Sequence, residues 1–156
     1  MGKEIECKFL VKSEAWRELA KGSSYRQGYL STVKERTVRI RTVDNAGFLT
    51  IKGVAAGATR AEYEYKIPAA DAHEMLTNLC EQPLVEKTRY KIPQGDLTWE
   101  IDEFSGENKG LIVAEIELKE EGQKFGKPDW IGEEVTGDPK YFNSNLSKIP
   151  FTKWTK

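Results

Sequence analysis

The strongest constraint on this chain is a repeated pattern in which charged residues occupy every second position, with an apolar or neutral residue between them. The pattern begins at Glu4, Glu6 and Lys8 and recurs in six later segments. Side chains along a β-strand point alternately to its two faces. Each segment is therefore predicted to be a strand with one charged and one apolar face. The fourteen charged positions are Glu4, Glu6, Lys8, Arg39, Arg41, Lys52, Glu62, Glu64, Lys87, Arg89, Glu100, Asp102, Glu115 and Glu117.

Strand-like alternation is present in eight segments, and seven of them carry the charged pattern. The breaks between segments have turn composition, as in DNAG at 44–47 and PQGD at 93–96. Such short loops favour antiparallel neighbours. The predicted strands span residues 3–11, 24–33, 36–43, 47–53, 59–67, 86–93, 96–104 and 111–119.

Helical patterns are fewer than strand patterns. A helix is predicted within 13–21, with Ser13 as its N-cap, and another within 69–80, while the tail has a turn at 128–132 and a helix near 138–148. These helices are too few to cover one face of an open eight-stranded sheet. A closed sheet solves this problem if the apolar face points outward and the charged face inward, and eight strands can close.

The predicted fold is therefore α+β: an eight-stranded antiparallel closed β-barrel, or tunnel, with a charged interior and a few helices packed outside. A single domain is expected to span residues 1–156. For any one strand taken alone, a charged face that simply meets solvent remains the simpler interpretation. Moving an ion out of water costs on the order of several kcal/mol, and a domain is stable by only about 5–15 kcal/mol. The interior must therefore hold water and ions.

The composition of this lining indicates its ligand. Six of the charged positions are basic, a density suited to several phosphate groups in a row. The acidic positions would repel such a ligand unless a hard cation lay between them, and carboxylates bind Mg²⁺ or Mn²⁺. The chain has neither a Walker loop nor a GxGxxG motif, and its only histidine, His73, lies in a predicted helix. The remaining chemistry is attack on phosphorus by a metal-activated water.

Composition excludes other classes of function. Lys and Arg total 24 against 25 Asp and Glu, which argues against binding nucleic acid through a positive field. No window is apolar enough for a signal peptide or a membrane span. Two cysteines are too few for a disulfide framework, so we expect a cytoplasmic protein. A homodimer is compatible with the sequence.

The ordered set of motifs resembles the CYTH domain proteins, also called triphosphate tunnel metalloenzymes, and within them the bacterial inorganic triphosphatase branch. The match runs from about Lys3 to the end of the chain. It implies an eight-stranded antiparallel tunnel that acts on triphosphate groups with a divalent metal. The motifs are ExExK at Glu4, Glu6 and Lys8; RxR at Arg39 and Arg41; TxK at Thr50 and Lys52; ExE at Glu62 and Glu64; KxR at Lys87 and Arg89; Asp102; and ExE at Glu115 and Glu117.

The resemblance also implies roles for these residues. Glu6 positions the attacking water as well as binding metal, and Lys87 stabilises or protonates the leaving oxygen. Glu62 and Glu64 either hold a second metal or orient the lysine and arginine side chains across the tunnel. Mg²⁺ or Mn²⁺, as two ions, is the expected cofactor. The expected metal ligands are Glu4, Glu6, Asp102, Glu115 and Glu117, and the expected phosphate ligands are Lys8, Arg39, Arg41, Lys52, Lys87 and Arg89.

The expected reaction is hydrolysis of inorganic tripolyphosphate to pyrophosphate and phosphate. A class IV adenylate cyclase and a thiamine or nucleoside triphosphatase are alternatives within the same family. A non-catalytic polyphosphate-binding module is an alternative of another class. Tyr29 and Tyr65 could enter the tunnel or pack outside it, and Lys91 is expected on the side opposite Lys87.

Overall fold

The computed structural model describes residues 3–154 and contains nine strands and two α-helices within that range. The ends of the predicted 1–156 domain lie outside it. The strands are β1 (Lys3–Val11), β2 (Gly22–Ser31), β3 (Thr37–Val43), β4 (Ala46–Lys52), β5 (Thr59–Ile67), β6 (Val85–Gln94), β7 (Leu97–Ser105), β8 (Ile112–Glu117) and β9 (Ile131–Glu134). The helices are α1 (Ala69–Asn78) and α2 (Asn143–Lys148), and the short 3₁₀ turns are η1 (Ala15–Glu18), η2 (Gly106–Asn108), η3 (Pro139–Tyr141) and η4 (Phe151–Lys153).

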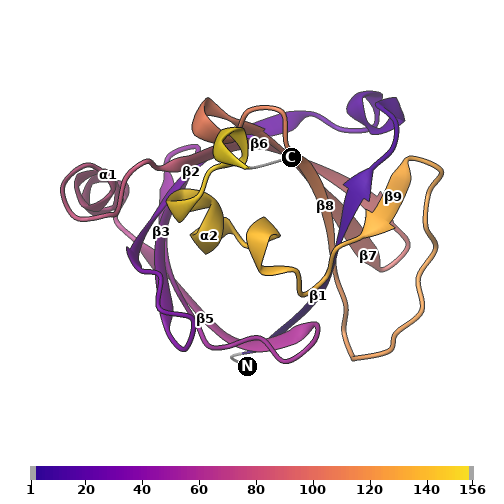
Figure 1. The fold of residues 1–156 in the computed structure, drawn as a ribbon, viewed down its shortest axis with the longest axis horizontal. Coiled ribbons are helices and arrows are strands. Elements are labelled where there is room, and N and C mark those ends of the chain that lie inside the picture. Colours follow the sequence, from indigo (N-terminus) through magenta and orange to yellow (C-terminus); the bar gives the residue numbers. More distant parts are fainter. Residues whose placement is uncertain (1–2, 155–156) are drawn as a thin grey trace.

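Eight of the strands form a closed antiparallel ring (Figure 1). Their order is β5-β4-β3-β2-β6-β7-β8-β1, and β1 pairs with β5 to close the ring. In the part of the chain that the structure describes, this closing pairing is short and runs from Lys3 opposite Ala61 to Ile5 opposite Thr59. By comparison, β6 and β7 pair over nine positions. The predicted eight-stranded antiparallel tunnel fold is confirmed.

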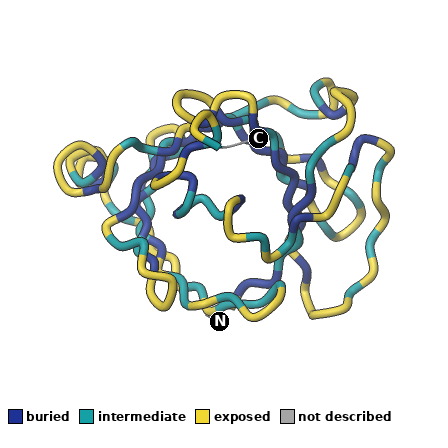
Figure 2. Tube along the Cα trace, viewed as in Figure 1, coloured by how far each residue is buried: buried dark blue, intermediate teal, exposed yellow. Residues whose placement is uncertain are grey.

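The strand registers carry the charged positions to one side of the wall. Arg89 lies opposite Asp102 across β6 and β7, and Lys8 lies opposite Glu115 across β1 and β8. Several of these side chains, Lys87 and Asp102 among them, are buried within the ring. Figure 2 shows the wall buried along much of its length at β8, whereas β5 is intermediate or exposed throughout. The alternation in the sequence is thus an alternation between tunnel and outer face.

The main apolar core lies outside the ring. Phe9, Trp99 and Ile116 point outward from β1, β7 and β8 and are almost fully buried. The loop after β8 folds back over them, and Trp99 makes edge-to-face contacts with Phe9 and Trp130 at ring-centre distances of 5.6 and 5.8 Å. On the opposite side of the ring, α1 covers β3 and β4. The wall is therefore stabilised from its outer face.

The local structure differs from the sequence prediction at two places, a helix that does not form and a strand that was not predicted. Residues 13–21 form only the 3₁₀ turn η1, and Glu14 rather than Ser13 occupies the N-cap position. Trp16 is fully buried but Leu19 is 55% exposed, so a single side chain anchors this segment and cannot stabilise a longer helix. The turn expected at 128–132 is present, but it leads into β9, which pairs with β1. A four-residue strand is too short to show alternation in sequence.

The position of α2 also differs from the expected packing on the outside. Figure 1 shows η3 and α2 projecting across one opening of the ring. Contacts agree with this placement, because Asn143 of α2 accepts a hydrogen bond from Lys87 inside the tunnel. The C-terminal segment therefore covers one end of the tunnel. None of the described helices has the length and apolar character needed to cross a membrane.

Candidate active site

The ring encloses a cavity of about 370 Å³. Thirteen of the fourteen charged positions predicted from the sequence line it, and Asp102, the fourteenth, is fully buried against two of the lining side chains. The structure thus brings the whole predicted set together from seven strands. The thirteen are Glu4, Glu6, Lys8, Arg39, Arg41, Lys52, Glu62, Glu64, Lys87, Arg89, Glu100, Glu115 and Glu117.

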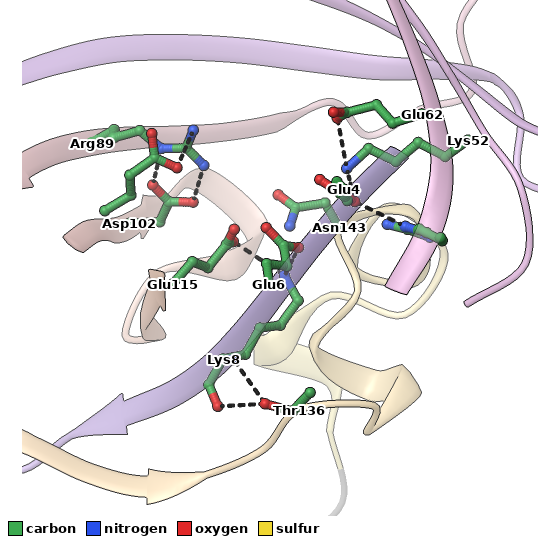
Figure 3. A network of polar contacts seen from close by, with 12 residues as sticks. Glu4, Glu6, Lys8, Lys52, Glu62, Arg89, Asp102, Glu115, Thr136 and Asn143 are labelled. Atoms are coloured by element: carbon green, nitrogen blue, oxygen red, sulfur yellow. Dashed lines mark hydrogen bonds and ion pairs between the residues drawn. The ribbon is translucent and has the colours of Figure 1, made fainter. Parts of the chain in front are cut away.

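Asp102 is the centre of the basic side of the cavity. Arg89 donates two hydrogen bonds to it, from Nε and Nη2 at 2.7 and 2.8 Å, and Lys87 Nζ lies 2.8 Å from Oδ2 (Figure 3 shows the arginine pair). Burial raises the pKa of Asp102, but the charges of Arg89 and Lys87 outweigh it and hold that pKa below its usual value. Asp102 is therefore ionised and fixes the position of both cations.

The pKa of the Lys87 ammonium is strongly lowered in the tunnel. Burial lowers the pKa of its ammonium to about 7, with Arg89 and Arg41 lowering it further and Asp102 opposing them. Burial and the neighbouring Arg39 also lower the pKa of Arg41, to about 9. A lysine with a pKa near neutrality exists in both protonation states at physiological pH and can donate a proton to a leaving group.

The acidic side of the cavity is built around Lys8. Its Nζ lies 3.1 Å from Glu115 Oε1 and 3.3 Å from Glu6 Oε1. Burial, with the charges of Glu115 and Glu4 adding to it, raises the pKa of Glu6 to about 7. Glu115 stays ionised because Lys8, Arg89 and Lys87 outweigh its burial and lower its pKa, and it also accepts a hydrogen bond from Glu6. Glu6 and Glu115 thus both lie beside the Lys8 ammonium (Figure 3).

A third group of charges lies where β1 meets β4 and β5. Glu4 Oε1 accepts hydrogen bonds from Lys52 Nζ at 2.9 Å and from Arg60 Nε at 3.1 Å. Burial opposes its ionisation, but these two cations lower the pKa of Glu4 to about 2. Glu62 lies 3.5 Å from Lys52, and Glu64 lies 3.5 Å from Arg39. Glu62 and Glu64 are thus placed to orient basic side chains.

The carboxylates offer the oxygen donors that a hard divalent cation binds. Among residues 3–154, however, no three carboxylates converge into a formed metal cluster. Glu4 and Asp102 are occupied by basic partners. By contrast, burial and neighbouring acids raise the pKa of both Glu6 and Glu117, the latter to about 6. This excess of negative charge would be relieved by a cation, so Glu6, Glu115 and Glu117 fit such a group.

The sequence prediction did not include all the residues that line the cavity. Arg60 and Lys91 line the cavity, and each is two residues from a predicted member of its strand, so the same alternation would have found them. The expectation that Lys91 faces the other side was wrong for this reason. Tyr29 lines the cavity, whereas Tyr65 is 56% exposed.

Two further residues had no such signal in the sequence. Gln27 comes from β2, the strand without charged alternation, and contacts Asn143 of the C-terminal segment. Asn143 itself lines the cavity and lies in α2, after the last strand of the ring in sequence. Only the three-dimensional structure places these two uncharged side chains among the charged ones.

Comparison with known proteins agrees with this geometry. The CYTH domain model matches residues 2–151. An inorganic triphosphatase of Acetivibrio thermocellus is 56% identical over 97% of both chains, and one of Nitrosomonas europaea is 41% identical over 92% of this chain and 96% of its own. A crystal structure of an inorganic triphosphatase aligns with a TM-score of 0.62 at 35% identity, covering 92% of this chain and 96% of that one. The chain belongs to the CYTH domain family.

Proposed function

We propose that this chain is an inorganic triphosphatase, which hydrolyses tripolyphosphate to pyrophosphate and phosphate with a divalent metal. The observation that carries the proposal is the set of six buried or half-buried basic side chains around one cavity of about 370 Å³. The names of the two curated relatives support the same reaction. The six proposed phosphate ligands are Lys8, Arg39, Arg41, Lys52, Lys87 and Arg89.

The proposed cofactor is Mg²⁺ or Mn²⁺, bound as two ions. Glu6, Glu115 and Glu117 would hold it, and Glu4 and Asp102 could add carboxylate oxygens if phosphate oxygens replaced the basic side chains that now bind them. The bound cation supplies neutralisation of phosphate charge and lowers the pKa of a bound water. Glu62 and Glu64 serve to orient Lys52 and Arg39.

The protein's own residues perform the proton transfers. Glu6 accepts the proton of the attacking water at a carboxylate oxygen that does not hold the cation. The new bond forms between the water oxygen and a terminal phosphorus, and the bond from that phosphorus to the bridging oxygen breaks. Lys87 Nζ, with a pKa of about 7, gives a proton to the departing pyrophosphate oxygen.

Release of phosphate from four substrates tests the proposal. Tripolyphosphate, thiamine triphosphate, ATP and pyrophosphate are each incubated with Mg²⁺, Mn²⁺ or Ca²⁺. We expect tripolyphosphate with Mg²⁺ or Mn²⁺ to have the highest kcat/KM. Cyclic AMP formed from ATP would instead identify an adenylate cyclase. Tight binding of tripolyphosphate without phosphate release under any metal would identify a binding module.

The role of Lys87 has a separate test. Lys87→Ala is expected to lower kcat by about 10²–10⁴-fold, the usual contribution of a positioned acid. Lys119→Ala is the matched control, because Lys119 follows β8 and its side chain is 67% exposed. Lys87→Ala with an unchanged kcat and only a raised KM would limit Lys87 to binding substrate.

The cellular setting stays a prediction. Both Cys7 and Cys80 are free thiols, which is consistent with the proposed cytoplasmic location because thiols stay reduced there. Non-reducing electrophoresis of protein from cell extracts checks their state. A homodimer, and the expected lack of nucleic-acid and membrane partners, are checked by light scattering and by binding assays.

A further inference from the structure

The C-terminal segment reaches into the tunnel through one side chain, Asn143. It lies at the first position of α2 and lines the cavity. Figure 3 shows it among the charged side chains of the tunnel, between the Arg89 and Asp102 pair and the group around Glu4 and Lys52. Asn143 is thus an uncharged side chain surrounded by charged ones.

The hydrogen bonds of Asn143 fix which way its amide faces. Arg41 Nε can only donate, and it donates to Gln27 Oε1 at 3.1 Å, so the Gln27 amino group must face the other way. That amino group donates to Asn143 Oδ1 at 3.0 Å. Lys87 Nζ donates to the same oxygen, also at 3.0 Å. The amide orientation therefore follows from a chain of unambiguous donors.

This orientation leaves the Asn143 amino group free. Its oxygen is used twice, by Gln27 and by Lys87, and no residue within 3–154 accepts a hydrogen bond from Nδ2. Nδ2 belongs to a side chain that lines the cavity in which Lys87 and Arg89 also lie. An uncharged donor at such a place binds a phosphate oxygen without repelling a metal ion.

We propose that Asn143 is a substrate-binding and positioning residue, in which Nδ2 donates a hydrogen bond to an oxygen of the triphosphate while Oδ1 holds Lys87 and Gln27 in place. The inference rests on the proposed function and adds to it the statement that the site is incomplete without the C-terminal segment. Gln27 is fully buried and connects Asn143 to Arg41, so it acts through Asn143 and is a positioning residue.

Two variants separate the parts of this proposal. Asn143→Asp keeps an oxygen for Lys87 and Gln27 but replaces the donor by a carboxylate oxygen that repels phosphate. Its KM for tripolyphosphate is expected to rise by about tenfold or more, the scale of losing a hydrogen bond to a charged group. Asn143→Leu removes both functions, and both a raised KM and a lowered kcat are expected.

A matched control lies two residues further along the same helix. Asn145 Nδ2 donates to the Pro139 carbonyl at 2.8 Å, and Asn145 does not line the tunnel cavity. Asn145→Ala is expected to keep KM and kcat within about twofold, even if it lowers Tm. Binding of tripolyphosphate in EDTA, measured by calorimetry, adds a readout that does not depend on turnover.

The outcomes are distinguishable from failure of the proposed function. If the wild-type protein releases no phosphate from tripolyphosphate, the proposed function fails. If the wild-type protein is active and folded Asn143→Asp and Asn143→Leu keep KM, kcat and binding within twofold, the role of Asn143 is wrong while the function stands. Should Asn143→Leu fail to fold, the nearly isosteric Asn143→Asp decides.

Discussion

Asp102 and Glu103 are neighbours on β7, and each binds an arginine through two hydrogen bonds, but they do so on opposite faces of the ring wall. Asp102 binds Arg89 inside the tunnel at 2.7 and 2.8 Å. Glu103 binds Arg17 outside it at 2.8 and 2.9 Å. The inner pair is 0% and 7% exposed, whereas the outer pair is 36% and 32% exposed. The two pairs therefore have similar hydrogen-bond geometry, but one is buried in the tunnel and the other is in contact with water.

The difference shows what the strand alternation does to electrostatics. Outside, water solvates both partners, so the pair adds little to stability. Inside, each ion has lost much of its water, and removal of one partner leaves the other uncompensated. The inner charges must therefore remain mutually paired until a phosphate or a metal replaces a partner. The positions of the side chains inside the tunnel are therefore fixed by ion pairing rather than by apolar packing.

The largest expected effect comes from breaking the inner pair. Asp102→Ala leaves Arg89 and Lys87 without their shared carboxylate and should lower the free energy of unfolding by about 3–5 kcal/mol. Urea denaturation measures this loss. Tripolyphosphate should raise the stability of this variant more than that of the wild type, because its oxygens replace the lost charge. A loss below about 1 kcal/mol would mean that water in the tunnel already solvates both cations.

An effect of intermediate size on the free energy of unfolding is expected for Glu6→Gln, which should stabilise the protein rather than destabilise it. Its pKa is raised from 4.5 to about 7, so the folded state binds this proton more tightly than the unfolded state. The resulting stabilisation is complete below pH 4.5 and is lost as the pH rises through about 7. Glu6→Gln mimics the protonated form and should match the wild type at pH 4.5. Without divalent metal at about pH 9, it should be more stable by up to about 2–3 kcal/mol.

Thermal unfolding across this pH range, with EDTA or Mg²⁺, checks the effect at Glu6. Mg²⁺ should remove the advantage of Glu6→Gln at high pH, because the cation compensates the ionised carboxylate of the wild type. An advantage that is independent of pH would contradict a raised pKa at Glu6.

The smallest effect is expected for the outer pair. Hydrogen bonds from Arg17 lower the pKa of Glu103, so the contribution of this pair is present above the normal glutamate pKa and is lost as the pH falls below it. Glu103→Gln should cost less than about 1 kcal/mol at neutral pH, and added salt should reduce that cost further. Urea denaturation in low and high salt tests both statements. A cost equal to that of Asp102→Ala would remove the distinction between the two faces.

The sequence predicts the wall of the tunnel well and its closed end poorly. A two-residue period is a direct consequence of strand geometry, so it places residues such as Lys8 and Glu115 on one face without knowledge of the fold. The same period would also have placed Arg60 and Lys91. Gln27 and Asn143 meet through a contact between segments 116 residues apart in the chain, and their amides have no pattern of their own.

Local sequence patterns also do not predict secondary structure correctly where tertiary packing determines which element forms. Residues 13–21 have the spacing of a short amphipathic helix, yet only Trp16 finds a place in the core and the segment stops at one 3₁₀ turn. β9 forms because β1 offers an unpaired edge to it, which is a property of the partner strand. Neither outcome is encoded within the segment itself.

Among the described residues, the pairing between β1 and β5 is the shortest in the ring, and we call it the seam. Within residues 3–154, three residue pairs join these strands, together with the hydrogen bond from the Glu6 amide to the Ala58 carbonyl at 3.0 Å. Glu4 crosses this seam to Lys52 and Arg60, so an ion pair of the cavity also holds the ring shut. Local opening costs least where few contacts must break. Amide hydrogens of the seam should therefore exchange before those of β6 and β7, and occupancy of the tunnel should govern how often the ring opens.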